Sequence, residues 1–267
     1  MIFQRLIWAS LAVAFAVGLV QTGVQQLQAV PIILAAEVFE DQKIEAPAAA
    51  EAAPDAAAAA HEGHAMAEED DEWAPEDGLE RTGWTFVANV LHAFSMALLV
   101  FAVMGVAQWR GTALRALPLA LVTAAAGWLV FHFWPSIGLH AEIPGMDAAR
   151  LGSRQAWWIL AALSAAGACA VAAGMRSHLR WLLAAALLAL PYVVGAPHIT
   201  ADPLGGFQGE AQAALRDLGQ QFVWATTWLS LCFWACMGVA GGLAYQRWVQ
   251  PALRASVGGA VPAARAV

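Results

Sequence analysis

Long apolar runs alternate with short polar connections along this chain, and the pattern predicts a helical membrane protein. A helix needs about 20 apolar residues to cross the hydrocarbon core of a bilayer. Six runs approach that length: about residues 6–36, 84–107, 114–134, 156–173, 179–195 and 222–245. The fifth run is the shortest and contains Pro191, which weakens a continuous helix. We therefore expect an all-α integral membrane protein with about six transmembrane helices.

Composition agrees with lipid as the main solvent of the chain. Hydrophobic residues make up 60% of the sequence and charged residues 12%, whereas soluble domains carry about 25% charged residues. Three cysteines, all within apolar runs, argue against a disulfide framework. The sequence contains no glycine-rich nucleotide loop, serine nucleophile elbow or HExxH motif. We expect no enzymatic activity, no tightly bound cofactor and no nucleic-acid partner.

The distribution of charge predicts the orientation in the membrane. With six crossings, the two termini and the second and fourth connections share one side, which holds eight basic residues and no acidic ones. The other three connections hold five basic residues and all twenty acidic residues, a net charge of −15. Basic residues accumulate on the cytoplasmic side of membrane proteins. The pattern thus predicts a multi-pass protein of the cell inner (plasma) membrane with both termini cytoplasmic and a long acidic first outer loop.

These spans divide the chain into four parts. We expect a first transmembrane helix over 1–36, an extracytoplasmic acidic and histidine loop over 37–83, a five-helix membrane domain over 84–250 and a short cytoplasmic tail over 251–267. Residues 46–72 begin as an Ala/Pro-rich stretch with scattered acids, and we expect this part of the loop to be partly disordered. Arg5 and the apolar run after it also permit a cleaved signal peptide, but the run is long for one, which favours a retained helix.

The outer loop carries donors for a divalent transition metal. The HEGH motif spaces His61 and His64 three residues apart, and five acids follow at 68–72. Imidazole and carboxylate groups suit such ions, although a charge run with incidental histidines also fits a plain solvated linker. Other candidate metal ligands are Glu76, Asp77 and Glu80 before the second span, His92 within it, and His198 after the proline-containing fifth span.

Polar side chains within the spans predict a path for the ion. Asn89, His92 and Met96 share one helical face, and Gln25 and Gln28 share another. Glu37 at the outer end of the first span and His132 near the outer end of the third complete the candidate path. Polar groups in hydrocarbon need partners and often mark transport pathways. The alternative is that the glutamines and Asn89 join neighbouring helices by hydrogen bonds.

Four segments resemble the CbtA-type predicted cobalt transporter subunits: QQLQAVPIILAAEVFE, WAPEDGLERTGWTFVANVL, RQAWWILAALSAA and LPYVVGAPH. The resemblance extends over essentially the whole chain. It implies import of cobalt for cobalamin synthesis, together with a small single-span CbtB-type partner that carries a histidine-rich segment. The residues that match the family pattern are Gln25, Gln26, Pro31, Glu37, Glu40, His61, His64, Trp73–Arg81 and Gly195–His198.

These observations predict a membrane subunit for uptake of a divalent transition metal, which the resemblance implies is Co²⁺. The acidic outer face would gather the ion and pass it to the intramembrane polar path. Two alternatives stay open. One is a non-transporting interaction or sensor subunit whose acidic loop docks a partner. The other is a membrane haem or redox protein with His92 and His132 as axial ligands.

Overall fold

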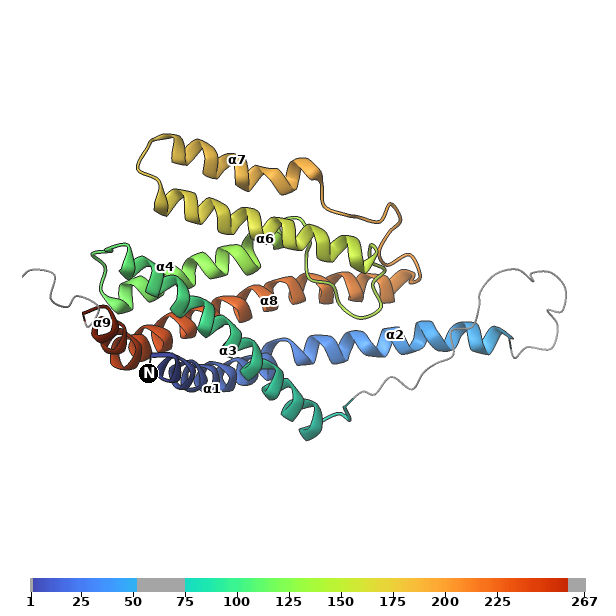
Figure 1. Ribbon diagram of the computed structural model, residues 1–267. Coiled ribbons are helices and arrows are strands. Elements are labelled where there is room, and N and C mark those ends of the chain that lie inside the picture. Colours follow the sequence, from blue (N-terminus) through green and yellow to red (C-terminus); the bar gives the residue numbers. More distant parts are fainter. Residues whose placement is uncertain (1, 52–74, 259–267) are drawn as a thin grey trace, which may run out of the picture.

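The described residues, 2–51 and 75–258 of a computed structural model, are helices and their connections (Figure 1). The elements in chain order are α1 (Ile2–Gln28), α2 (Val30–Glu51), α3 (Leu79–Trp109), α4 (Ala116–Trp128), the π-helix η1 (Leu129–Phe133), α5 (Trp134–Ser136), α6 (Leu151–Gly174), α7 (Leu179–Val194), α8 (Gly209–Ala244), the π-helix η2 (Tyr245–Val249) and α9 (Gln250–Gly258).

Five of these helices are long and apolar enough to cross a membrane. They are α1, α3, the continuous helix Ala116–Ser136, α6 and the helix Gly209–Ala255 that begins with α8. The prediction of an all-α protein with several membrane-spanning helices is confirmed in these residues. The fifth predicted span corresponds to α7, whose 16 residues extend about 24 Å at 1.5 Å per residue. That length is shorter than the hydrocarbon core of about 30 Å.

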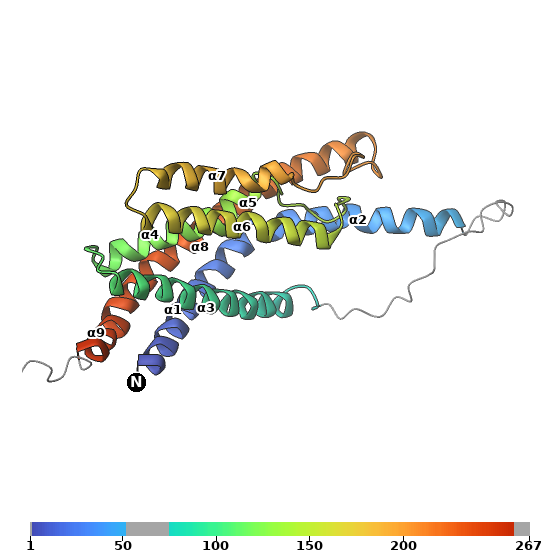
Figure 2. The ribbon, with the colours of Figure 1, turned by 45° about the horizontal axis from the view of Figure 1, so that its top comes forward.

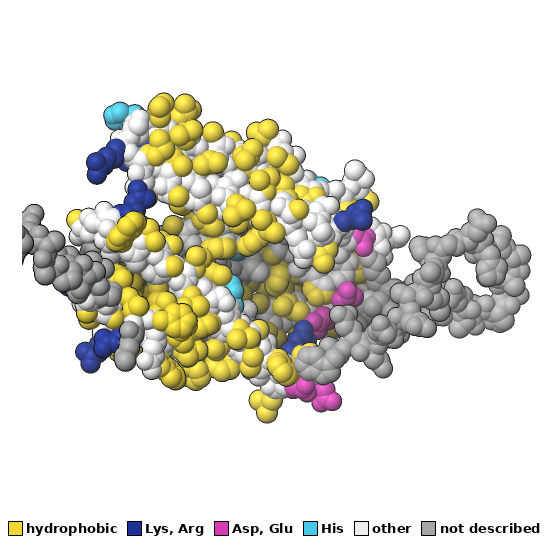
Figure 3. Space-filling model, viewed as in Figure 1, with side chains coloured by type: hydrophobic (Ala, Val, Ile, Leu, Met, Phe, Trp, Pro, Cys, Tyr) yellow, Lys and Arg dark blue, Asp and Glu magenta, His cyan; other side chains and the backbone are white. Residues whose placement is uncertain are grey.

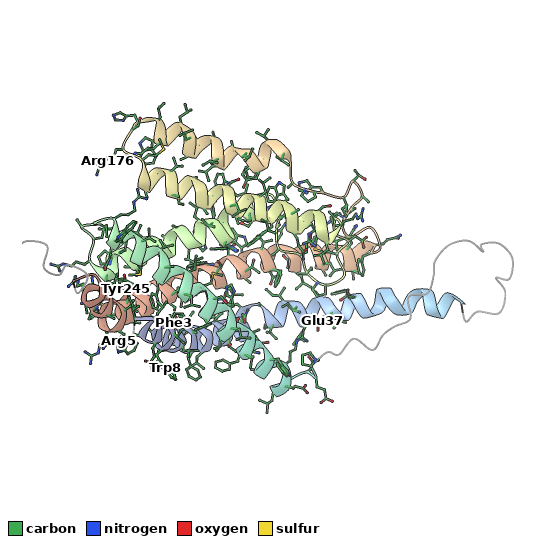
Figure 4. All side chains as sticks on the ribbon, in the orientation of Figure 1. Phe3, Arg5, Trp8, Glu37, Arg176 and Tyr245 are labelled. Carbon is green, nitrogen blue, oxygen red and sulfur yellow. The ribbon has the colours of Figure 1, made fainter. Side chains whose placement is uncertain are left out.

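The connections gather at two ends of the bundle (Figure 1). One end, here called the basic end, comprises residues 2–5, 110–115, 175–178 and 245–258. The other, the acidic end, comprises residues 37–51, 75–81, 137–154 and 195–221. Figure 3 shows the acidic side chains of the visible face at the acidic end only, and Figure 4 places Arg5 and Arg176 at the opposite end from Glu37. The charge separation read from the sequence is therefore present in the fold.

The main core lies where α1, α3, α4 and α8 meet, and small residues bring these helices close together. In α1, the side chains of Ala9, Val13 and Val17 are almost fully buried. A Cβ atom on Gly18 would lie 3.1 Å from the Cα atom of Val90, so α1 and α3 nearly touch there. Gly238 and Gly242 of α8 approach α4 in the same way. Small residues spaced four apart allow this close packing in membranes.

The first predicted span consists of two helices with a bend between them (Figure 2). Ala29 separates α1 from α2, and Pro31 lies two residues further on. Because proline has no N–H group, the helical hydrogen-bond ladder is interrupted at this point. α2 then continues to Glu51, beyond residue 36, where the sequence predicts the end of the first membrane helix. Alanine and glutamate are strong helix formers, which accounts for the longer helix.

Indole hydrogen bonds attach α7 to its neighbours. The Trp157 Nε1–H group of α6 donates to the carbonyl of Pro191 at 2.9 Å, and the Trp134 Nε1–H group donates to the carbonyl of Leu188 at 3.1 Å. The ring of Trp157 lies over Gly138, where a Cβ atom would come within 2.2 Å of it. The short helix is thus held by directional bonds to its backbone as well as by apolar packing.

A second, smaller core lies at the acidic end. Its buried residues come from α2, from the connections before α6 and α8, and from α8 itself: Ala36, Ile143, Leu204, Phe207 and Leu215. The backbone N–H of Asp147 donates to the carbonyl of Pro203 at 2.8 Å, which joins the two connections. The acidic end therefore has packed structure of its own beside the membrane helices.

We expect an acid-sensitive contribution to stability from Asp202. Its carboxylate accepts the Leu204 N–H at 3.0 Å and pairs with Arg216 at 2.7 Å. The Leu204 hydrogen bond, followed by Arg216, lowers the pKa of Asp202 below its ordinary value of 3.8. A lowered folded-state pKa stabilises the fold at higher pH, and this contribution disappears as the pH falls through that pKa. Asp202→Asn should lower Tm at pH 7, and the difference from wild type should shrink below pH 3.8.

Thermal unfolding in detergent between pH 3 and 7 measures this difference, with Glu76→Gln, an exposed acid at the same end, as the matched control. A Tm difference for Asp202→Asn that stays constant over this pH range would refute the assignment.

Candidate functional site

A cavity of about 600 Å³ lies beneath the acidic end, between η1, α5, α6 and α8. Aromatic and aliphatic side chains form much of its wall. Its polar lining consists of His132, Ser136, His140, Arg154, Gln155, Thr226 and Thr227. A concave site with a few converging polar groups is the usual form of a small-ligand site.

His132 reaches this cavity from a π-turn in the third membrane helix. Pro135 follows three residues later, and in a regular α-helix its ring would collide with the carbonyl of Phe131. The widened turn over Leu129–Phe133 relieves that collision, and the Trp134 N–H bonds to the carbonyl of Leu129, five residues back. Such π-turns occur frequently at functional sites. The proline that ends the turn thus also explains the position of the imidazole.

The hydrogen bonds of Thr227 assign the tautomer of His132. The Thr227 hydroxyl donates to the carbonyl of Val223 at 2.8 Å. Its oxygen is then left to accept a hydrogen bond, and the Nε2 atom of His132 lies 3.4 Å away. Neutral His132 consequently carries its proton on Nε2 and a free electron pair on Nδ1. Metal-binding histidines commonly have their second nitrogen held in this way.

Some of the other polar groups of the cavity are already hydrogen-bonded or ion-paired within the protein, and others are not. Ser136 and Thr226 donate to backbone carbonyls of their own helices. Arg154 forms an ion pair of 2.5 Å with Glu142, which offsets its charge. His140 and Gln155 are exposed and form no hydrogen bond with any described residue. Together with His132, they supply nitrogen and oxygen donors around a space large enough for a partly hydrated divalent ion.

The structure brings Gln25 and Asn89 together at the interface of α1 and α3. The Asn89 amide donates to Oε1 of Gln25 at 2.6 Å and to the hydroxyl of Thr22 at 2.9 Å. Closer to the acidic end of α3, the Thr82 hydroxyl accepts a hydrogen bond from the Gln26 amide at 3.0 Å. These polar groups of two helices satisfy one another, as interhelical hydrogen bonds in membranes do.

Arg81 forms ion pairs with two of the candidate carboxylates at the acidic end. Its guanidinium contacts both oxygens of Glu37 on α2, at 2.5 and 3.2 Å. It also pairs with Asp77, four residues earlier, at 2.8 Å. A guanidinium that binds a carboxylate through two nitrogens gives a geometrically well-defined pair. Glu37 and Asp77 are therefore parts of a clamp between α2 and α3, whereas Glu76 and Glu80 are exposed.

The remaining predicted residues lie apart from one another. The ring of His92 on α3 is exposed and packs 5.0 Å from that of Phe233 on α8, while Met96 packs against the main core. Gln28 is exposed at the end of α1, and His198 is exposed in the connection after α7. His61 and His64 lie outside the described residues. Residues 2–51 and 75–258 contain no group of three His, Cys, Asp or Glu side chains placed to hold a metal ion.

The sequence pointed to His132 but not to the residues around it. Thr227 and Gln155 lie in different helices, 95 and 23 residues away in the chain, and their types are ordinary for apolar helices. The FHFWP segment is a local signal, because a proline three residues after a mid-helix histidine forces the helix to widen or kink near it.

The packed apolar helices, with charge separated to two ends, define the class of multi-pass α-helical membrane proteins. Residues 3–246 match the model of the family described as probable cobalt transporter subunit (CbtA), and the chain belongs to that family. The match confirms the resemblance seen in the sequence. No curated protein and no solved structure matches the chain.

Proposed function

We propose that this chain is the membrane subunit through which Co²⁺ is taken up, and that the ion enters by the cavity that contains His132. One observation carries the proposal: His132, whose Nε2 atom is held by Thr227, lines a cavity beneath the end of the molecule where the acidic side chains gather. Co²⁺ is a borderline ion that accepts imidazole, amide and water ligands. Membership of the family supports cobalt as the cargo.

In this proposal the acidic end faces outward and both termini are cytoplasmic. The sequence gives the outer segments a net charge of −15, and such a surface raises the local concentration of cations. An inside-negative potential favours entry of a divalent ion by about 4.6 kcal/mol per 100 mV, twice the value for a single charge. The membrane potential or a partner protein therefore supplies the driving force.

The ion moves by exchange of ligands along the outer face. Residues 61–72, with His61 and His64, capture it at low external concentration, and the exposed groups Glu76, Glu80 and His198 hold it briefly near the membrane. His132 then takes it into the cavity. His92 is the next donor in this path, because its ring is exposed at the middle of α3 and forms no hydrogen bond with any described residue.

The biological setting follows from the family. As a subunit, the chain works with another protein, and we propose a single-span CbtB-type partner with a histidine-rich segment. The imported cobalt then serves cobalamin synthesis.

Replacement of His61 and His64 by glutamine tests the capture step. In cells that express the chain, we expect the double variant to reduce uptake of cobalt-57 several-fold at nanomolar external metal. Uptake at micromolar metal should stay close to wild type, because the cavity and its entry are intact. His178→Gln, at the basic end, is the matched control and should change neither value. Equal uptake by the double variant and the wild type at every concentration would identify residues 61–72 as a plain linker.

A further inference from the structure

A second and larger cavity, of about 1090 Å³, lies at the opposite end of the molecule from the proposed entry. It is bounded on one side by the end of α3 and the beginning of α4, and on the other by η2 and α9. Its polar lining consists of Gln108, Thr112, Arg115, Gln246, Gln250 and Arg254.

The two arginines give this cavity a positive charge that no carboxylate of the described residues balances. Arg115 and Arg254 come from opposite walls, and neither forms an ion pair with a described residue. The sequence has no acidic residue between Glu80 and Glu142 and none after Asp217, so an acidic partner from a neighbouring segment is absent as well. Two guanidinium groups that face one space without a carboxylate favour a bound anion, and phosphate oxygens match their geometry.

The rest of the wall points to a lipid as the source of that phosphate. The apolar side chains of Leu114, Leu117 and Leu253 also line the cavity, and Trp109 in its wall is 80% exposed. Exposed tryptophans at the ends of membrane helices lie at the level of lipid headgroups. A cavity lined by both guanidinium groups and leucine side chains therefore fits a molecule with a phosphate headgroup and acyl chains better than it fits free phosphate.

We propose that this cavity binds the headgroup of an anionic phospholipid, with Arg115 and Arg254 contacting the phosphate and the glutamine amides donating further hydrogen bonds. Basic pockets between membrane helices on the cytoplasmic side bind such headgroups. The bound lipid would connect the α3–α4 connection to α9 and so fix the position of the last helix.

Native mass spectrometry of the purified chain tests the proposal with three probes: phosphatidylglycerol, phosphatidylcholine and inorganic phosphate. Wild type should retain phosphatidylglycerol at least tenfold better than the zwitterionic lipid. The double variant Arg115→Gln/Arg254→Gln should lose about 10- to 30-fold of that binding, since each cationic residue contributes roughly 1 kcal/mol to attraction of anionic lipid. Arg5→Gln/Arg176→Gln removes two charges from the same end but outside this cavity (Figure 4). This control should bind as wild type does.

An equal loss of phosphatidylglycerol binding in both double variants would show a general attraction to the basic surface and would overturn the site. Equal retention of phosphatidylglycerol and phosphatidylcholine by wild type would overturn it as well. Displacement of phosphatidylglycerol by millimolar inorganic phosphate would keep the phosphate chemistry but overturn the lipid as its source. Unfolding temperatures of both double variants show whether a loss of binding comes from loss of the fold.

Discussion

Replacing His132 with glutamine should reduce cobalt-57 uptake by a factor of at least about 10. Loss of an outer-shell group around a metal already costs 10- to 100-fold in affinity or activity, and here the ligand itself is removed. Glutamine keeps a similar length and an amide that still reaches Thr227, but it has no imidazole Nδ1 for the ion. The fold should survive, because His132 is only half-buried and its one hydrogen bond, to Thr227, is long at 3.4 Å.

Cobalt uptake by cells expressing each variant, normalised to the amount of chain in the membrane, measures this effect. His178→Gln again provides a histidine replacement at the basic end. A His132→Gln variant that transports at the wild-type rate would exclude His132 from the path. Transport at the wild-type rate by His92→Gln would exclude His92 from the path but would leave the role of His132 unchanged.

The largest effect on stability should come from Gly242→Leu in α8. A Cβ atom on Gly242 would lie 2.9 Å from Cδ1 of Leu117, 3.0 Å from Cβ of Ala120 and 3.0 Å from Cα of Leu117. Two of these three atoms are fixed close to the backbone of α4, so the helices must separate to admit a side chain. Overpacking of this kind costs about 1–3 kcal/mol, occasionally more, and a leucine at so close a contact between two helix backbones should be at the upper end.

Thermal unfolding in detergent provides the measurement, with Gly23→Leu as the matched control. Gly23 also lies in a membrane helix, α1, but a Cβ atom there would have no neighbour within 4 Å. We expect a clear fall in Tm for Gly242→Leu and little change for Gly23→Leu. Equal Tm values for the two variants would mean that α4 and α8 do not pack as described.

Much of the fold could be predicted from the sequence because lipid imposes a simple rule. A polypeptide backbone in hydrocarbon must satisfy its own hydrogen bonds, as a helix does, so the apolar runs predict the positions of the long helices. The acidic residues predict one end of the bundle. The bend at Ala29 was missed, although Pro31 is a visible signal, because an uninterrupted apolar pattern spans it. The helix α2 also continues past residue 36, the predicted end of the first membrane span, since polarity marks the edge of the membrane and not the end of a helix.

The site was harder to predict because it depends on contacts between distant segments. His132 was found as a polar group within a span, but its hydrogen bond to Thr227 joins residues 95 positions apart. Asp77 was predicted as a metal ligand and Glu37 as part of the ion path. The structure pairs both with Arg81, and only the Asp77–Arg81 spacing of four residues gives a local signal of that pairing.

Cobalt binding by His132 can be tested directly by anomalous X-ray scattering at the cobalt absorption edge, with crystals of the wild-type chain soaked in Co²⁺. We expect an anomalous peak about 2 Å from Nδ1 of His132, the usual metal–imidazole distance, within the cavity formed by η1, α5, α6 and α8. The peak should be absent in His132→Gln crystals treated identically. Cobalt bound elsewhere in the wild-type chain, with no peak in this cavity, would contradict the proposal that the ion enters by His132.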